Sequence, residues 1–284
     1  MNAQKWNSPS RAVVLGGGGV TGIAWEVGVL AGLLESGVDL HLADVIIGTS
    51  AGAFVGAALA SGYEMNKLFA AQSDTNSAEI PVAASKELMQ AWYKAFATGG
   101  SDPRKVGAEF GRIAKNNPSP VSPEQRRSVV ESRLVTRKWP ANLKVTAIDA
   151  NTGELHTFDH QAGISLPDAV SASGAVPGIW PLVSIGDRFW TDGGMVSTTN
   201  SRLAEGYERI VILSPMPNGY GSIPGAADDA ASMRTSADVY LITPNGRSVE
   251  SIGSNIYDQT RRGVSAVAGR EQGCSIAEAV LTMW

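Results

Sequence analysis

The chain has 284 residues, a hydrophobic content of 43% and a formal net charge of -4. This length and apolar content are enough for one large domain with a sizeable core, and the negative charge argues against a nucleic-acid-binding surface over the whole protein. The single cysteine, Cys274, excludes an internal disulfide and a cysteine-based metal cage, and it fits a reducing compartment.

Two strand-turn-helix units open the chain. Residues 11–15 form an apolar, β-branched run that ends in glycine, which predicts a buried strand, and residues 21–35 then carry apolar side chains at helical spacing. A second apolar run at residues 45–47 leads through a turn into a predicted small-residue helix over residues 51–61. Two such units in succession are typical of a parallel α/β sheet.

The middle of the chain, residues 63–139, has a mostly helical pattern that the breaks TGGSDP and NNPSPVSP divide. Because strand patterns resume after it, we predict a helical cap inserted into the α/β domain. The segment KELMQAWYKAF places large apolar side chains on one broad helical face: Leu88, Met89, Trp92, Tyr93 and Phe96.

The cap also concentrates positive charge, with nine Lys or Arg against three Glu between Arg104 and Lys138. Two interpretations remain open. The cap packs its apolar face on the domain and exposes its basic side chains to solvent, or the basic and aromatic residues contact an anionic membrane or acyl chains.

Strand patterns return in LKVTAID, ELHTF, RFWTDGG, RIVILSP and DVYLITP, with short helices predicted in LPDAVSASGA and in residues 255–284, and a loop in PNGYGSIPGAADDA. The elements predict a single α/β domain over residues 1–284, in which a mostly parallel central sheet lies between helices in an α/β/α arrangement. We expect the catalytic motifs in residues 11–202, the helical cap in residues 63–139, and further strands and helices in residues 203–284.

No segment predicts passage into or through a membrane. The N-terminal sequence MNAQKWNSPS lacks the apolar region of a secretory signal. No window reaches about 18 uninterrupted apolar residues, the length that suggests a spanning helix. We therefore expect a cytoplasmic protein that touches a membrane peripherally at most, and the sequence says nothing of its oligomeric state.

Residues 48–52 read Gly-Thr-Ser-Ala-Gly, a G-x-S-x-G between a predicted strand and a predicted helix. This context fits a nucleophile elbow, in which small residues permit a tight turn that exposes the hydroxyl of Ser50 at the helix N-terminus. The alternative is an ordinary strand-to-helix turn in which Ser50 only caps the helix.

A nucleophilic serine needs a base, and the sequence restricts the choice. The histidines are His41, His156 and His160, and none follows late in the chain, where the α/β-hydrolase order of serine, acid and histidine requires one. We interpret all three as loop or surface residues. Asp192, which ends an aromatic strand pattern, can accept the proton of Ser50 directly if the two side chains meet, although D-G-G alone is also a common hairpin turn.

Residues 16–19 are four consecutive glycines between the first strand and the first helix. Bare backbone amides at a helix N-terminus favour negative charge, so the loop suits either a phosphate or the oxyanion of an acyl-transfer intermediate. Gly17, Gly19 and Gly22 also match the dinucleotide fingerprint. That interpretation leaves both the serine motif and the D-G-G motif without a role.

Taken together, GGGGVTG, GTSAG and DGG in this order resemble the patatin-like phospholipase family, and the resemblance covers nearly the whole chain, with the cap as its weakest part. It implies a mostly parallel α/β sheet, Ser50 as nucleophile and Asp192 as base in a dyad without histidine. It also implies an oxyanion hole made by the amides of Gly17, Gly18 and Gly19. The motif glycines are Gly17, Gly19, Gly22, Gly48, Gly52, Gly193 and Gly194.

The resemblance implies a lipid acyl hydrolase of the phospholipase A or lysophospholipase type, which releases fatty acid from a phospholipid, a lysophospholipid or a related ester through an acyl-enzyme. No cofactor, metal ion or nucleic-acid partner is expected. Two alternatives stay open: an acyltransferase that uses the same dyad, and a lipid-binding module whose dyad is idle. Since an aspartate of ordinary pKa, about 3.9, is a poor base toward serine, we expect burial to raise the pKa of Asp192.

Three side chains near these motifs need separate interpretation. Thr21 stands where the family usually has a basic residue, which removes a charge beside the predicted oxyanion hole. Trp25 replaces a smaller or imidazole side chain of many members, and we interpret it as a core residue, with a narrowed pocket as the alternative. Trp180 is expected to lie either in the acyl pocket or in the core.

Overall fold

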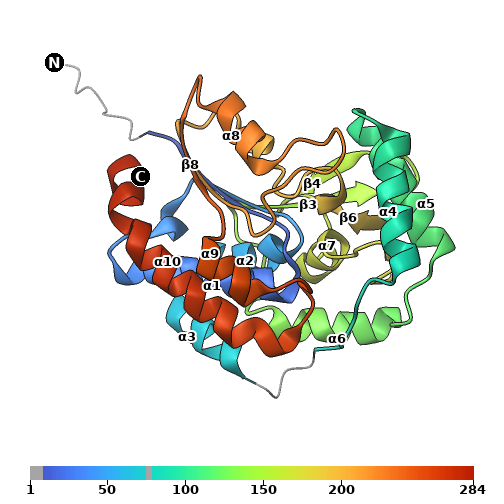
Figure 1. Ribbon diagram of the computed structural model, residues 1–284, viewed down its shortest axis with the longest axis horizontal. Helices are drawn as coiled ribbons and strands as arrows, with labels where there is room; N and C mark the ends of the chain where they lie inside the picture. The colour runs from blue at the N-terminus through green and yellow to red at the C-terminus, as the bar shows by residue number, and fades with distance from the viewer. Residues whose placement is uncertain (1–8, 75–78) are drawn as a thin grey trace.

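The computed structural model describes residues 9–74 and 79–284. Within these residues, one mixed sheet of eight strands is flanked by helices (Figure 1). Most of the N-terminal sequence for which we predict no secretory signal lies outside the described residues. In the described part of the chain, no helix is both long enough and apolar enough to cross a membrane.

The sheet has the strand order β5-β6-β3-β2-β1-β7-β8, and β4 also pairs with β3. Strands β3, β2, β1, β7 and β8 are parallel to their neighbours in this order, whereas β4 and β6 run antiparallel to β3, and β5 antiparallel to β6. The strands are β1 (Arg11–Leu15), β2 (Val45–Gly48), β3 (Leu143–Asp149), β4 (Leu155–Phe158), β5 (Val183–Ile185), β6 (Arg188–Asp192), β7 (Arg209–Leu213) and β8 (Asp238–Ile242).

The helices that connect these strands include every helical segment that the sequence pattern predicts. They are α1 (Gly19–Glu35), α2 (Ala51–Ala60), α3 (Met65–Ala70), α4 (Lys86–Gly99), α5 (Pro103–Asn116), α6 (Pro123–Arg133), α7 (Leu166–Ser173), α8 (Ala226–Met233), α9 (Gly246–Ile252) and α10 (Arg262–Met283). The predicted α/β fold with a mostly parallel sheet between helices is therefore confirmed.

Strand β3 brings the ends of two other strands together. Gly48 at the end of β2 pairs with Val145, and Asp192 at the end of β6 pairs with Ala147. Because β4 pairs with both Val145 and Ala147, it occupies one edge of β3, and β2 and β6 share the other edge. Strand β2 runs with β3 and β6 runs against it, so their C-terminal ends approach each other along that edge.

Side chains alternate along the central strands and separate two cores. In β1, Val13 and Leu15 pack in a cluster with side chains of α1, α2, α7 and α10, whereas Ala12 and Val14 pack in another with Ala230 of α8. The strands are therefore covered on both faces, as their near-continuous apolar sequences predict.

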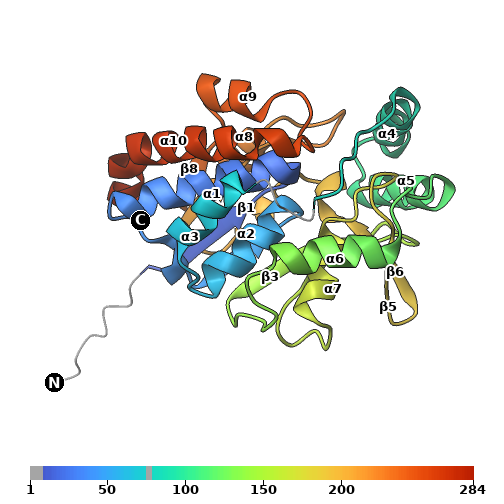
Figure 2. The same cartoon turned by 90° about the horizontal axis from the view of Figure 1, so that it is seen from below.

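The helices of the predicted cap do not pack together as one unit. Helices α4 and α5 pack on each other at one end of the sheet, near β6 (Figure 2), while α6 packs against α7 and α3 against α1. A third apolar cluster joins Val106 and Phe110 of α5 to Ile148 of β3 and to Trp180. The limits of the cap, residues 63–139, stay a prediction.

The C-terminal half contains elements that the sequence pattern does not predict. Strand β5 and helix α9 are too short to give a clear periodic signal. The predicted loop PNGYGSIPGAADDA is wrong from Ala226, where α8 begins. There the carboxylate of Asp228 accepts the N–H of Gly225, the residue before α8, at 3.1 Å. An acidic residue three positions after the N-cap is a sequence signal for the start of a helix.

Helices α1 and α10 lie side by side with their backbones in contact (Figures 1 and 2). Glycines permit this approach, since a Cβ atom at Gly28 would lie 2.1 Å from the carbonyl oxygen of Ala266, and one at Gly273 would lie 2.3 Å from that of Val29. Side chains of both helices belong to the largest core cluster, so the separation of the two helices affects the packing of that cluster.

We predict that Gly273→Ala lowers the free energy of unfolding by about 1–3 kcal/mol, because the added methyl group forces the two helices apart. Urea denaturation measures the effect. Gly246→Ala is the matched control, since a Cβ at Gly246 meets nothing within 4 Å. Equal stability of the two variants would contradict the close packing of α1 on α10.

Candidate active site

Ser50 lies in a strained turn between β2 and α2, with φ 54° and ψ -113°, and its side chain makes no helix-capping hydrogen bond. The flanking glycines are required for space: a Cβ at Gly52 would lie 2.0 Å from the carbonyl oxygen of Leu15, and one at Gly48 would lie 2.6 Å from the Cα of Ala53. The backbone N–H of Ser50 donates to the hydroxyl of Ser173 at 2.8 Å. This is the geometry of an elbow rather than of an ordinary helix cap.

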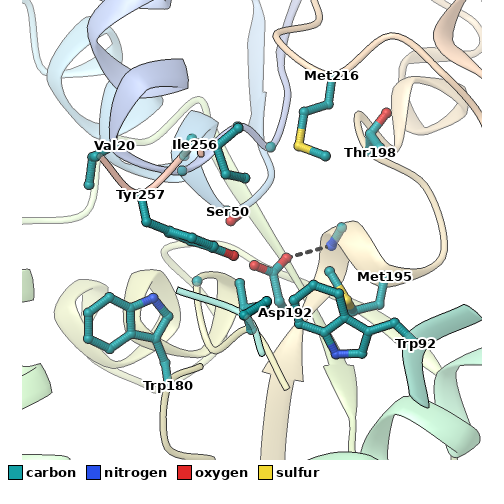
Figure 3. Close-up of a pocket in the computed structure, with 18 of the residues that line it drawn as sticks. Val20, Ser50, Trp92, Trp180, Asp192, Met195, Thr198, Met216, Ile256 and Tyr257 are labelled. Carbon is teal, nitrogen blue, oxygen red and sulfur yellow. Dashed lines mark hydrogen bonds between the residues drawn. The ribbon is translucent and has the colours of Figure 1, made fainter. Parts of the chain in front are cut away.

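The carboxylate of Asp192 faces Ser50 across the floor of a cavity (Figure 3). Asp192 is 1% exposed, and its Oδ1 accepts the N–H of Gly194 at 2.7 Å. Its Oδ2 is buried and accepts no hydrogen bond of normal geometry from a described residue. Burial raises the pKa of Asp192 to about 7, against the opposing effects of the Ser50 hydroxyl, the Gly194 N–H and the Arg126 guanidinium.

A buried polar network connects the two motifs behind these side chains. The amide of Asn200 donates to the hydroxyl of Thr49 at 3.0 Å and to the carbonyl of Gly193 at 3.1 Å. The hydroxyl of Thr146, from β3, lies 2.9 Å from that of Thr49. Asn200 therefore connects the residue before Ser50 to the residue after Asp192, and it is the other described non-glycine residue with positive φ.

The first half of the glycine loop is held by the protein itself. The N–H of Gly16 donates to the carboxyl group of Glu26 at 2.9 Å, and burial raises the pKa of Glu26 well above its ordinary value. The N–H of Gly17 donates to the carbonyl of Thr198 at 2.7 Å. The resemblance implies that Gly17 donates to an oxyanion, but in this structure its amide already has an acceptor.

The second half of the loop is different, because the amides of Gly18 and Gly19 have no acceptor among the described residues. Both glycines also meet close neighbours: a Cβ at Gly18 would lie 2.6 Å from that of Pro215, and one at Gly19 would lie 2.5 Å from the carbonyl oxygen of Ile256. The loop thus presents two free N–H groups at the start of α1, where the helix dipole favours an anion.

Thr21 has a structural role in place of the family's basic residue. Its N–H and hydroxyl both contact the carbonyl oxygen of Ile256, at 3.2 and 3.3 Å, and the residue is fully buried. This contact holds the segment with Ile256 and Tyr257 against the glycine loop. Burial and the nearby Asp192 raise the pKa of Tyr257, so its hydroxyl, which points toward Asp192 in Figure 3, stays protonated.

The cavity has a volume of about 630 Å³ and is bounded by the glycine loop, the elbow, α4 and the segment that carries Tyr257. Trp92 and Trp180 line it (Figure 3). Because Trp180 is also only 5% exposed, it is both a cavity-lining residue and a core residue. Trp25 is a core residue, since it is fully buried, lies outside the cavity lining and donates its indole N–H to Gln272 at 3.3 Å.

None of the three histidines lines this cavity. His41 contacts the carboxylate of Asp39 at 2.9 Å, and the ring of His156 packs edge-on against Trp190 with centroids 5.0 Å apart. His160 lies in an exposed turn after β4. Among residues 9–74 and 79–284, no group of three His, Cys, Asp or Glu side chains is arranged to hold a metal ion.

Three side chains near Ser50 and Asp192 are not predicted from the sequence: Arg126, Asn200 and Tyr257. Arg126 is 3% exposed and lines the cavity, so the prediction that the cap solvates its basic residues is wrong for it. The sequence pattern of α6 could have indicated this burial, because Arg126 lies three residues before the buried Val129 and therefore on the same face of the helix. Asn200 lies outside the predicted elements. Tyr257 lies in residues 255–284, where helix is predicted, but α10 begins only at Arg262, so only the tertiary fold brings these two side chains to the site.

The fold and cavity define an α/β protein with a serine elbow opposite a buried carboxylate. The chain belongs to the patatin-like phospholipase family, whose model, described as Patatin-like phospholipase, matches residues 13–204. A comparison with curated protein sequences found no match.

Solved structures match this chain at low sequence identity. VipD from Legionella pneumophila is 13% identical, with a TM-score of 0.47, and the match covers 95% of this chain and 67% of VipD. The type III effector protein ExoU is 18% identical, with a TM-score of 0.42 over 96% of this chain and 53% of ExoU. ExoU in complex with SpcU, from the type III secretion system of Pseudomonas aeruginosa, matches at 16% identity over 94% of this chain, with a TM-score of 0.40. The chain thus spans about half the length of ExoU.

The raised pKa of Asp192 predicts how stability depends on pH. Between the ordinary pKa of 3.8 and the folded-state pKa of about 7, the unfolded chain loses this proton while the folded chain keeps it. The contribution of Asp192 to folding stability is therefore present below about pH 4 and is lost as the pH rises to about 7. Asp192→Asn should remove this loss and unfold at a higher temperature than wild type at pH 8, which calorimetry measures. Equal pH dependence of the two proteins would contradict the burial effect.

Proposed function

We propose that this protein is a serine acyl hydrolase that cleaves the carboxylic ester of a lipid, with Ser50 as nucleophile and Asp192 as general base. The observation that carries the proposal is the elbow serine facing a buried carboxylate of pKa about 7. A base with a pKa near the operating pH combines a large deprotonated fraction with enough basicity to accept the serine proton. Membership of the patatin-like phospholipase family supports a lipid ester as the substrate.

In the first half-reaction, Asp192 accepts the hydroxyl proton of Ser50 while Ser50 Oγ forms a bond to the ester carbonyl carbon. The resulting tetrahedral intermediate collapses when the protonated Asp192 gives its proton to the leaving alcohol oxygen and the carbon–oxygen bond of the ester breaks. The alcohol leaves, and the acyl group remains on Ser50.

In the second half-reaction, water replaces the alcohol. Asp192 accepts a proton from the water, the water oxygen bonds to the acyl carbon, and the bond to Ser50 Oγ breaks. Asp192 returns its proton to Ser50, and the fatty acid is released. Each step moves one proton through the same carboxyl group, so the dyad needs no histidine.

The negative charge on the carbonyl oxygen requires fixed donors, and this contribution is usually the largest in such reactions. We place the oxyanion hole at the amides of Gly18 and Gly19, which have no acceptor among the described residues. The bond from Gly17 to Thr198 then holds the loop in position.

The cavity supports an apolar acyl chain as part of the substrate. Its walls include the buried apolar side chains of Phe54, Val176 and Trp180. Met89 and Tyr93 of α4 also line it and are 40% and 69% exposed, so apolar surface continues outward from the cavity. This surface favours a lipid that enters along α4, with peripheral contact between α4 and a lipid surface.

A fluorophosphonate probe tests the nucleophile directly. We expect wild type to be labelled, Ser50→Ala to remain unlabelled, and Asp192→Asn to be labelled at least about a hundredfold more slowly because the base is lost. Ser61→Ala, at the far end of α2, should be labelled like wild type. An unlabelled wild-type protein would favour the idle lipid-binding module, and transfer of acyl groups to an added alcohol without fatty-acid release would favour the acyltransferase.

The pKa of about 7 for Asp192 also predicts the pH profile of the reaction. Only the deprotonated carboxylate accepts the serine proton, so kcat/KM should fall tenfold per pH unit below about pH 7 and be level above it. Hydrolysis of p-nitrophenyl butyrate between pH 5 and pH 8, corrected for spontaneous hydrolysis, measures the profile. A level profile across this range would exclude Asp192 as the titrating base.

A further inference from the structure

Arg126 places a buried positive charge at the wall of the cavity. It belongs to α6, lines the cavity and is 3% exposed. Its guanidinium lies over the ring of Trp180, with Cζ 4.0 Å from the ring centroid. Burial lowers the pKa of Arg126 to about 9, which leaves the group charged at neutral pH.

Most of the hydrogen-bonding capacity of this guanidinium is unused. Its Nη2 donates to the carbonyl of Gly174 at 3.3 Å, whereas Nε and Nη1 are buried without an acceptor among the described residues. A guanidinium has five N–H groups, of which Nε and Nη1 hold three. Buried donors without acceptors are costly, and a charged one more so, which favours an anionic ligand that supplies the acceptors.

The surrounding charges do not neutralise Arg126. The carboxylate of Glu79 acts to raise the pKa of Arg126, but Glu79 is paired with Arg133, whose Nε lies 2.6 Å from its Oε1. Asp192 and Tyr257 also influence Arg126, but the Tyr257 hydroxyl stays protonated and Asp192 has a pKa of about 7. The buried Arg126 and the partly buried Arg133 thus share the charged carboxylate of Glu79, and both arginines line the cavity, so the excess positive charge lies at its wall.

Arg126 is also close to the nucleophile through the end of α7. Ser173 accepts the backbone N–H of Ser50, and the next residue, Gly174, accepts the N–H of Arg126. A ligand whose ester carbonyl lies at Ser50 therefore shares the cavity with the guanidinium of Arg126. Arg126 and Asp192 line the same cavity, and the charge of Arg126 acts to lower the pKa of Asp192.

We propose that Arg126 binds the phosphate group on the alcohol side of the substrate, so that the protein selects acyl esters of a phosphorylated glycerol over neutral acyl esters. This inference rests on the proposed function of Ser50. While the ester carbonyl lies at Ser50, the acyl side carries no charge, so an anion at Arg126 belongs to the alcohol side. A guanidinium suits phosphate because its planar N–H groups match the phosphate oxygens.

A matched pair of soluble substrates tests the selectivity: 1-octanoylglycerol 3-phosphate and 1-octanoylglycerol. We expect kcat/KM of wild type to be at least tenfold higher for the phosphate ester. Arg126→Gln should reduce that value at least tenfold, mainly through KM, and change kcat/KM for 1-octanoylglycerol by less than threefold. Arg126→Lys, which keeps the charge, should recover part of the loss for the phosphate ester only.

Arg137→Gln is the matched control, because it removes the same charge beyond the end of α6 from a side chain that is 73% exposed. Its kinetics should equal those of wild type with both substrates. A wild-type enzyme without preference for the phosphate ester would overturn the proposal. An equal loss of kcat/KM for both substrates in Arg126→Gln would also overturn the proposal, because it would mean that Arg126 only supports the packing of α7.

Binding without turnover separates this inference from the proposed function. Calorimetry on Ser50→Ala uses the ether 1-O-octylglycerol 3-phosphate, with 1-O-octylglycerol and octanoate for comparison. The phosphate ether should bind at least tenfold more tightly than the neutral ether, and the added Arg126→Gln should remove this difference. Dependence on Arg126 for octanoate alone would assign the residue to the fatty-acid carboxylate and overturn the proposal. Arg126-dependent binding of the phosphate ether by a protein that hydrolyses no ester would refute the proposed function and leave the phosphate site in place.

Discussion

The site depends on the way one strand pairs with two others along a single edge. Strands β2 and β6 meet end to end against β3, at Val145 and Ala147, so Ser50, which follows β2, faces Asp192, the last residue of β6. The residue between these positions, Thr146, belongs to the hydrogen-bonded network with Thr49 and Asn200. The separation of Ser50 from Asp192 is therefore determined by regular backbone pairing, and it does not depend on the lengths of the connecting segments.

Burial changes the ionisation of the charged side chains at and near the site. Water is excluded from Asp192, Glu26 and Arg126, each of which is at most 3% exposed. The two carboxyl groups hold their protons more tightly as a result, and the guanidinium keeps a charge that solvent does not screen. Buried ionisable groups are costly to a fold. Asp192 and Arg126 line one cavity and Glu26 holds its glycine loop, an arrangement more typical of a functional site than of a packing core.

The sequence predicts the parts of this arrangement that depend on local pattern. The apolar runs of β1 and β2, the elbow at Ser50 and the D-G-G turn are local features, and their order identifies the family. The sequence does not predict the engagement of the Gly17 amide by Thr198, because that contact joins residues 181 positions apart in the chain. The inward position of Arg126 is missed because charge composition describes a segment as a whole, whereas burial depends on which face of α6 packs against α7 and Trp180.

The contact of Thr21 with Ile256 ties the glycine loop to a segment near the C-terminus, so the folding unit extends beyond the residues that the family model matches. The family match stops at residue 204, but β7 lies inside the sheet between β1 and β8, and Ile256 packs on the glycine loop. A chain that ended at residue 204 would expose one edge of β1, uncover the face of α1 that α10 protects, and leave Thr21 without its acceptor. The boundary of the recognisable sequence is therefore not a boundary of cooperative folding, and the last 80 residues belong to the same folding unit as the motifs that identify the family.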